Sequence, residues 1–222
     1  MRDRHLAQDV ADLGRADPLW PGQLATLVAL ALYLALPVQL TIGPNWPVPA
    51  AELGLLAALV GATRAGRTAG RRRELAMGLV LVAVVANLTA LGMLSRYLLA
   101  GGHASGSKLI GGGVLIWLTN WLLFAVLYWE LDRGGPVRPA GATRPVAPDL
   151  LFPAMTEPRL APHGWKPSFV DYLYVSLTNQ TAFSPTDTMP LTTRVKLLMA
   201  VQGVAGLVTT GVIVAHAVNI LG

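Results

Sequence analysis

The chain has 222 residues, of which 53% are hydrophobic and 13% are charged, with a mean hydropathy of +0.51. Soluble domains carry about 25% charged residues, so this composition predicts an integral membrane protein. The sequence contains no cysteine, which excludes disulfide bonds, thiolate metal sites and cysteine nucleophiles. The net charge of +5 comes from basic residues beside hydrophobic segments, which indicates membrane topology and not a nucleic-acid partner.

The first segment, residues 1–21, is polar and carries charges of both signs. It lacks the apolar core of a cleavable signal peptide. Leu6, Val10 and Leu13 recur at helical spacing, so we expect a short amphipathic helix on the cytoplasmic side.

Residues 22–132 predict a membrane region of four helices. A span needs about 20 apolar residues, and the expected spans are 22–42, 49–63, 75–99 and 109–129. The second is short and holds Glu52 near its start. Polar and aromatic residues of the third and fourth spans are expected to bond across helices or to form the interfacial belt: Asn87, Thr89, Thr119, Asn120, Trp117, Trp121, Tyr128 and Trp129.

Residues 133–167 are rich in proline and arginine and predict an extended, non-helical connection. Just before it, Glu130 and Asp132 stand with Arg133 at the end of a span, where ion pairing or helix capping is the default role. A role of Glu130 in gating or coordination is the alternative. The last region, 168–222, ends in a fifth span at about 192–221.

The basic residues predict the orientation of the chain. Fifteen of the 17 Lys and Arg residues lie in the N-terminal tail, the 64–73 loop and the segments 133–167 and 194–196, and only Arg96 and Lys108 fall on the other side. This bias predicts a multi-pass protein of a bacterial inner membrane, with a cytoplasmic N-terminus and five spans.

A short helix followed by a polar turn precedes the last span. Asp171 suits the start of a helix over 168–180, which is too short to cross a bilayer. Pro185 cannot continue that helix, and Asp187 is expected to help cap the last one. Irregular backbone at membrane depth is tolerated only in protein or beside water, so a reentrant segment here predicts a functional site.

Residues 173–211 resemble, without a gap, the pore helix, filter and inner helix of tetrameric potassium channels. Ser176 aligns with the pore-helix serine, Thr181 aligns with the threonine at the filter entry, and Asp187 aligns with the aspartate after the filter. Pro190 and Thr192 meet the proline and threonine that follow, Lys196 meets a basic residue, and residues 204–206 meet the glycine hinge. The Asp-x-Leu-Tyr-x-Ser pattern is also similar to bacterial integral membrane proteins of unknown function.

The filter itself departs from the channel family. Phe183, Ser184, Pro185 and Thr186 stand where the family has Val-Gly-Tyr-Gly. A potassium filter is a column of backbone carbonyls, and Pro185 fixes φ and removes a donor, so potassium selectivity does not transfer. The charge bias also puts this loop on the cytoplasmic side, opposite to potassium channels. The resemblance nonetheless implies a filter-like site at Thr181, Ala182, Phe183, Ser184, Pro185, Thr186 and Asp187.

The last helix carries a polar stripe that is a second candidate site. Gln202, Thr209 and His216 recur every seven residues, and Gly206 lies beside them. Polar groups within a membrane usually face a bundle interior or water, so the stripe predicts either pore lining or bonding between helices. The four histidines lack metal-site spacing, and no nucleophile–base pair supports an enzyme. We expect no cofactor.

These patterns together predict an all-α membrane protein with five transmembrane helices and a reentrant helix before the last span. The expected function is to conduct or bind small ions, as a homo-oligomer in the lipid bilayer and as a tetramer if it is channel-like. The alternative is a non-conducting scaffold or accessory subunit whose 133–167 segment docks a partner. An enzyme acting on lipids is a third class, without a supporting cluster of residues.

Overall fold

The computed structural model of the chain describes residues 18–41, 46–64, 69–99, 106–136, 147–157, 159, 165–181 and 187–221. The amphipathic helix expected near the N-terminus lies outside the described residues up to position 17. The described part is helical, apart from one antiparallel pair of two-residue strands. It therefore agrees with the all-helical class expected from composition.

The elements follow one another along the described chain as five long helices, several short ones and two strands. Their bounds are α2 (Trp20–Leu34), the 3-10 helix η1 (Val38–Leu40), α3 (Pro47–Arg64), α4 (Ala69–Leu99), α5 (Gly106–Leu131), the 3-10 helix η2 (Asp132–Gly134), β1 (Leu150–Leu151), α6 (Pro153–Thr156), α7 (Phe169–Thr181), β2 (Met189–Pro190) and α8 (Thr193–Leu221).

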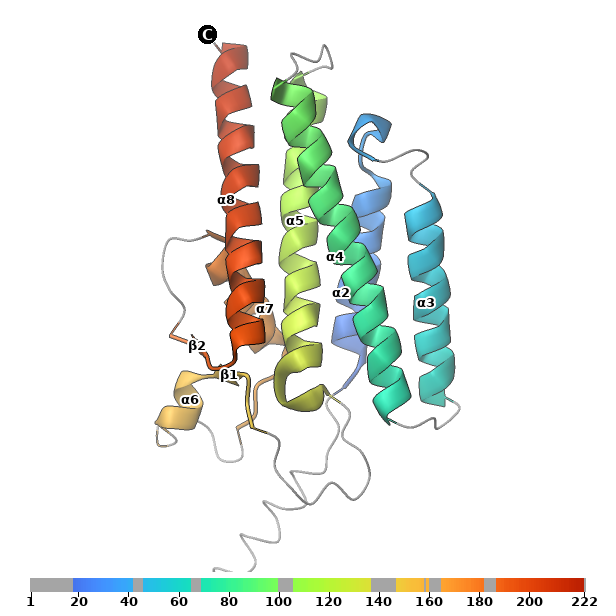
Figure 1. Cartoon of the computed structure of the whole chain (residues 1–222), viewed down its shortest axis with the longest axis vertical. Helices are drawn as coiled ribbons and strands as arrows, with labels where there is room; N and C mark the ends of the chain where they lie inside the picture. Colours follow the sequence, from blue (N-terminus) through green and yellow to red (C-terminus); the bar gives the residue numbers. More distant parts are fainter. Residues whose placement is uncertain are drawn as a thin grey trace, which may run out of the picture.

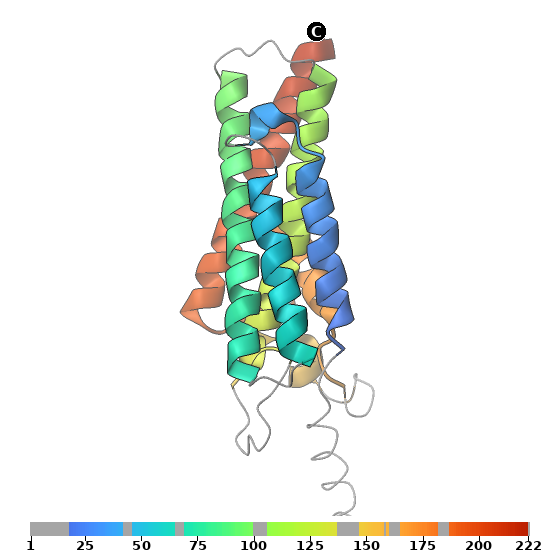
Figure 2. The same ribbon diagram turned by 90° about the vertical axis from the view of Figure 1, so that its right-hand side faces the viewer.

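The long helices α2, α3, α4, α5 and α8 stand side by side and alternate in direction (Figures 1 and 2). The helix α5 is the central one, because it packs against α2, α4, α7 and α8. The helix α3 packs mainly on α4 at one edge of the bundle. The short elements β1, β2 and α6 gather at the end where α8 begins (Figure 1).

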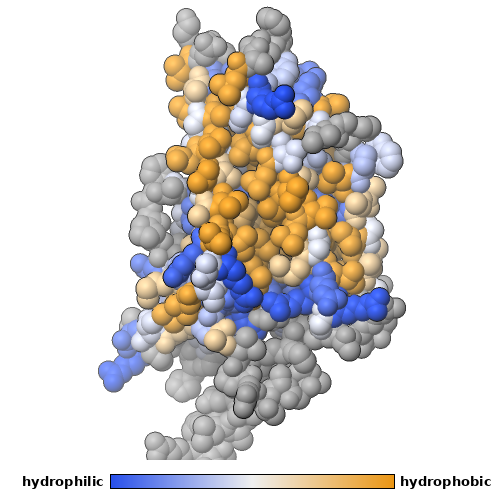
Figure 3. Space-filling model, in the orientation of Figure 1, coloured by the Kyte–Doolittle hydropathy of each residue, from blue (hydrophilic) through white to orange (hydrophobic). Residues whose placement is uncertain are grey.

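Three of the helices are long and apolar enough to cross a membrane, over 70–99, 108–131 and 193–218, and α2 and α3 are shorter apolar helices. These lengths indicate a multi-pass membrane protein in contact with lipid. Figure 3 shows hydrophobic side chains over the middle of one face and hydrophilic ones gathered below them. The exposed apolar side chains of α4 and α8 include Leu81, Val85, Val204 and Leu207.

The observed helix bounds differ from the expected spans in two places. The helix α4 begins at Ala69, six residues before the expected span 75–99 and within the stretch 64–73 that was expected to be a loop. The first expected span, 22–42, is an α-helix only as far as Leu34 and then turns into η1. Pro37 explains the break, because proline disfavours helical backbone in the residue before it and has no N–H to donate. The other long helices and α7 begin and end within a few residues of the expected positions.

The connection 133–167 was expected to be non-helical, and that expectation was wrong for one turn. Pro153 starts α6, a four-residue helix, at the first helical position that proline favours. The neighbouring Leu150 and Phe152 are buried among aromatic side chains of the core. This stretch of the connection is therefore anchored to the bundle.

Candidate functional site

The helix α7 is built as a half-length member of the bundle. At its start, the backbone N–H and the hydroxyl of Ser168 donate to the Asp171 carboxylate at 2.7 and 2.8 Å, so the expected cap is present. Its last turn reaches the middle of α5, where the Gln180 side-chain amide donates to the Trp117 carbonyl at 2.8 Å. Figure 1 shows α7 beside the half of α5 and α8 nearer the short strands.

Buried amides hold α7 between α5 and α8. We call Asn120 of α5, Ser176, Asn179 and Gln180 of α7, and Gln202 of α8 the central amide cluster. The Gln202 amide nitrogen donates to the Ser176 hydroxyl at 2.7 Å and to the Ser176 carbonyl at 2.9 Å. The Asn179 amide donates to the Gln202 side-chain oxygen at 2.9 Å, and Asn120 donates to the Gln180 side-chain oxygen at 2.9 Å. Such a network fixes α7 in one position.

Three further hydrogen bonds join Tyr128 and Trp121 of α5 to this network. The Tyr128 hydroxyl donates to the Gln202 side-chain oxygen at 2.7 Å. The Ser176 hydroxyl donates to the Trp121 carbonyl at 2.7 Å, and the Trp121 ring N–H donates to the Leu173 carbonyl at 2.9 Å. Gln180 and Gln202 are 1% and 0% exposed, so the bonds from Tyr128 to Gln202 and from Gln202 to Ser176 are buried.

The predicted polar stripe of α8 faces this cluster. Gln202, Gly206 and Thr209 are buried toward the bundle, and the Thr209 hydroxyl donates to the Ala205 carbonyl of its own helix at 2.6 Å. A Cβ at Gly206 would lie 2.5 Å from the Gln180 carbonyl oxygen, so only glycine allows α8 to approach α7 so closely. His216 lies farther along α8 and is partly buried; its Nε2 has no hydrogen-bond partner among the described residues.

The structure describes the two ends of the filter-like segment. Thr181 is the last residue of α7, and its hydroxyl donates to the Thr178 carbonyl at 3.1 Å. Asp187 is exposed and leads into β2. The residues between them, Ala182, Phe183, Ser184, Pro185 and Thr186, lie outside the described residues.

A cavity lies at the carboxyl-terminal end of α7. It holds about 370 Å³ and is mostly apolar, with walls from α5, α7 and α8. Its lining residues are Val114, Trp117, Gln180, Thr181, Leu207, Thr210, Ile213 and Val214. Val114, Leu207 and Val214 of its lining are exposed, so the cavity is an apolar groove open to the surface of the bundle. The last carbonyls of a helix carry partial negative charge, so this end of α7 presents acceptors beside the groove.

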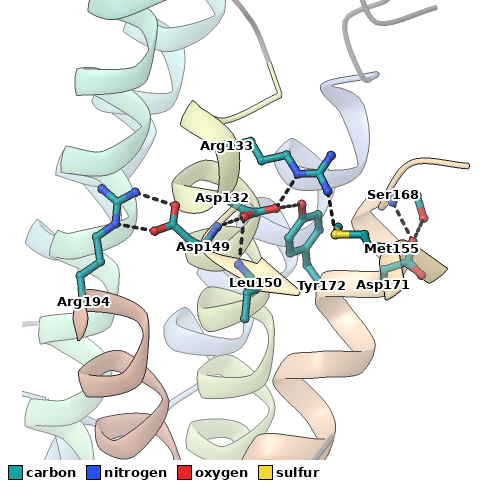
Figure 4. Close-up of polar contacts among 9 residues, drawn as sticks. All are labelled: Asp132, Arg133, Asp149, Leu150, Met155, Ser168, Asp171, Tyr172 and Arg194. Carbon is teal, nitrogen blue, oxygen red and sulfur yellow. Dashed lines mark hydrogen bonds and ion pairs between the residues drawn. The ribbon is translucent and has the colours of Figure 1, made fainter. Parts of the chain in front are cut away.

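A second polar cluster joins the connection to α5, α7 and α8 (Figure 4). The Asp132 carboxylate, 2% exposed, accepts the backbone N–H groups of Asp149 at 2.6 Å and Leu150 at 3.2 Å. Its other oxygen accepts the Tyr172 hydroxyl of α7 at 2.7 Å. Figure 4 shows these groups converging on Asp132 from three segments. One carboxylate therefore connects the end of α5, the connection and the start of α7.

Asp149 forms the other half of this cluster. The Arg194 guanidinium of α8 donates to its two oxygens at 2.9 and 2.5 Å, and the Thr192 hydroxyl donates at 2.7 Å. Burial acts to raise the pKa of the Asp149 carboxyl, but the bonds from Arg194 and Thr192 and the charges of Arg194 and Arg73 outweigh it and hold that pKa below its ordinary value. Asp149 is therefore a buried anion that ties the connection to α8.

The charged end of α5 has the structural role expected by default. Glu130 forms a buried ion pair with Arg72 of α4, with nitrogen–oxygen distances of 2.7 and 3.2 Å. Asn87 of α4 also reaches α5, where its amide donates to the Ile116 carbonyl at 3.2 Å. Sequence reasoning missed that Asp149 and Tyr172 belong with Asp132. The one available signal was the apolar run after Asp149, which is unusual in a segment rich in proline and arginine.

The described residues contain no group of three or more His, Cys, Asp or Glu side chains placed to hold a metal ion. Comparison of the chain with protein-family models, with curated proteins and with solved structures found no match.

Proposed function

We propose that this chain is a five-span inner-membrane protein that forms a homo-oligomer and binds and conducts small cations at the end of α7. The observation that carries the proposal is the half-length helix α7, whose carboxyl end stops against the middle of α5 beside the cavity of about 370 Å³. A helix that stops inside a bundle of spanning helices directs its terminal carbonyls into the membrane interior.

The alternating directions of the five long helices support the proposed topology (Figure 1). The ends of α3 and α5 and the starts of α4 and α8 then share one side with Arg71, Arg72, Arg73 and Arg194. That side is cytoplasmic by the positive-inside rule. The helix α2 alone is about 22 Å long at 1.5 Å per residue, and η1 continues the chain toward the far side.

The groups at the end of α7 favour cations. The terminal carbonyls and the Thr181 hydroxyl are acceptors. Asp187, six positions farther along the chain, places an exposed carboxylate on the return limb next to β2. Pro185 argues against a potassium-type column of carbonyls, so we propose passage of small cations without potassium selectivity.

The outer face of α7 and α8 supports an assembly of several copies. Apolar side chains cover it, and in the membrane they meet lipid or a second copy: Val170, Tyr174, Leu197, Val201, Val204, Leu207 and Val208. A pore built from one reentrant helix per chain needs further copies to close around it.

A non-conducting scaffold is the second candidate, and the central amide cluster favours it. The buried side chain of Gln202 on α8 forms hydrogen bonds with Ser176, Asn179 and Tyr128. Both ends of its amide therefore have partners within the bundle. These contacts give the reentrant helix a purely structural explanation.

Cation flux in liposomes separates the two candidates. Purified protein is expected to release a cation gradient, and Asp187→Asn and Thr181→Ala are each expected to reduce the rate severalfold, because they remove a charge and an acceptor from the path. The matched controls are Glu157→Gln and Thr89→Ala. Glu157 is an exposed carboxylate just after α6, and the Thr89 hydroxyl bonds a carbonyl of its own helix. A parent protein without flux would refute conduction and leave the scaffold. Unchanged flux in both site variants would refute an ion path through the end of α7.

A further inference from the structure

The connection between α5 and α7 contacts both limbs that flank residues 182–186. One limb is α7, and the other is the return through β2 into α8. Strand β1 pairs with β2, with Leu150 opposite Pro190 and Leu151 opposite Met189. The backbone N–H of Leu191 also donates to the Asp149 carbonyl at 2.8 Å.

We propose that residues 149–151 form a clasp that sets the spacing of these two limbs and couples the described part of the connection, residues 147–157, to the ion path. The inference rests on the proposed function for its effect on conduction. The connection would then have a regulatory role, because a partner that displaces residues 149–151 also displaces β2 and the first turn of α8, which are bonded to them.

Two carboxylates connect the clasp to both limbs. Tyr172 of α7 is bonded to Asp132, and Asp132 holds the backbone of Asp149 and Leu150. Arg194 of α8 is bonded to the Asp149 carboxylate. Both limbs are thus connected to the same three-residue segment by carboxylates that are at most 2% exposed (Figure 4).

The two limbs differ in how else they are held. The central amide cluster fixes α7 to α5 and α8 above this level. On the return limb, β2 pairs with β1 and with no other strand of the described chain. Leu191, Thr192 and Arg194 all take Asp149 as a hydrogen-bonding partner. Loosening the clasp should therefore move the return limb and leave α7 in place.

The absence of native cysteine allows a clean test with an engineered crosslink. Leu151→Cys with Met189→Cys places two thiols on antiparallel partners, whose Cα atoms are about 4.5–5.5 Å apart, within the range of a disulfide. Asp149→Asn weakens the clasp in the same background. Glu157→Gln makes the same chemical change on an exposed side chain nearby and is the control.

Two readouts are compared on the full chain in liposomes, before and after reduction. Asp149→Asn is expected to raise amide exchange over 187–195 and to change cation flux severalfold, and the oxidised crosslink is expected to reverse both. The exchange over 173–181 should stay as in the parent. Unchanged exchange over 187–195 in Asp149→Asn would overturn the clasp.

The flux readout separates this inference from the function it rests on. If the parent conducts and its flux is the same with Asp149→Asn and with the crosslink, the clasp does not control the ion path. Conduction itself is then still supported. If the parent conducts nothing, conduction fails, regulation of an ion path fails with it, and the exchange data alone decide whether the clasp positions the return limb.

Discussion

The two sides of the bundle are held together by different forces. On the side of α5, α7 and α8, buried side-chain hydrogen bonds cross from helix to helix, through Asn120, Gln180 and Gln202. On the side of α2, α3 and α4, hydroxyls bond their own helix, as Thr26 does to the Gly22 carbonyl and Thr89 to the Val85 carbonyl. The buried side-chain bonds of α4, from Arg72 to Glu130 and from Asn87 to the Ile116 carbonyl, run to α5. No side-chain hydrogen bond between described residues joins α3 to another helix.

This difference shows where the fold specifies a single arrangement. Apolar side chains gain little by leaving lipid for another apolar helix, so the packing of α3 on α4 orders the bundle weakly. A buried amide network loses free energy unless every partner is in place. The side of α5, α7 and α8, which the network holds in one arrangement, also contains the proposed ion site. The following experiments compare it with the side of α3 and α4.

The largest effect is expected from Gln202→Leu. The substitution keeps the approximate volume but leaves Ser176, Asn179 and Tyr128 without their shared partner, at a cost of about 3 kcal/mol in unfolding free energy. Thermal or denaturant unfolding in detergent measures the loss, and amide exchange should show α7 released from α8.

Leu59→Ala is the comparison on the other side. Leu59 belongs to a small apolar cluster of α3 and α4, with Ala76 and Leu79. Removing its side chain should cost about 2 kcal/mol and raise exchange in α3 while α7 stays protected. Equal exchange of α7 in both variants would contradict the proposed division of the bundle.

A smaller effect is expected from Gly206→Ala. The added methyl group would meet the Gln180 carbonyl oxygen at 2.5 Å and its Cγ at 2.6 Å. Overpacking of this kind costs about 1–3 kcal/mol, which unfolding measurements can resolve.

Gly211→Ala is the matched control on the same helix. No atom lies within 4 Å of a Cβ at that position, so alanine should be neutral or stabilise α8 by up to about 1 kcal/mol. If both variants lost the same stability, the close approach of α8 to α7 at Gly206 would not be the cause.

For the side of α5, α7 and α8, the sequence predicted the bounds of the helices well but did not predict the contacts between them. Pro167 and Asp171 mark the start of α7, and its observed bounds fall within one residue of the expected 168–180. The seven-residue recurrence of Gln202 and Thr209 indicated one helix face, and that face is buried. Spacing along one helix cannot identify the partner on another, so the bonds of Gln202 to Ser176 and Tyr128 needed the fold.

The clasp was beyond sequence reasoning for a related reason. Asp149 lies in a segment of turn-forming residues, 17 positions from Asp132 and 45 from Arg194. Its contacts exist only once α5, α7 and α8 are in place. The proline at position 37, by contrast, is a local signal, and it gives a physical reason for the early end of the first helix.

The smallest expected effect is a loss of stability in acid that depends on Asp149. Its folded-state pKa lies below the unfolded value, so ionised Asp149 stabilises the fold above the unfolded pKa of about 3.9. That contribution is lost as the pH falls through the lower folded-state value. Arg194 and Thr192 donate hydrogen bonds to this carboxylate, and the charge of Arg73 also acts on it.

Unfolding in detergent as a function of pH, with the parent and Asp149→Asn side by side, measures this contribution. The parent should lose stability toward and below pH 4 more steeply than the variant, because the amide at 149 has no proton to bind. Parallel curves would show that Asp149 is not held as an anion in the fold. A steeper parent curve would show that the connection is attached to α8 by charge, unlike the apolar attachment of α3 to α4. The ion-paired attachment is then the one that acid releases first.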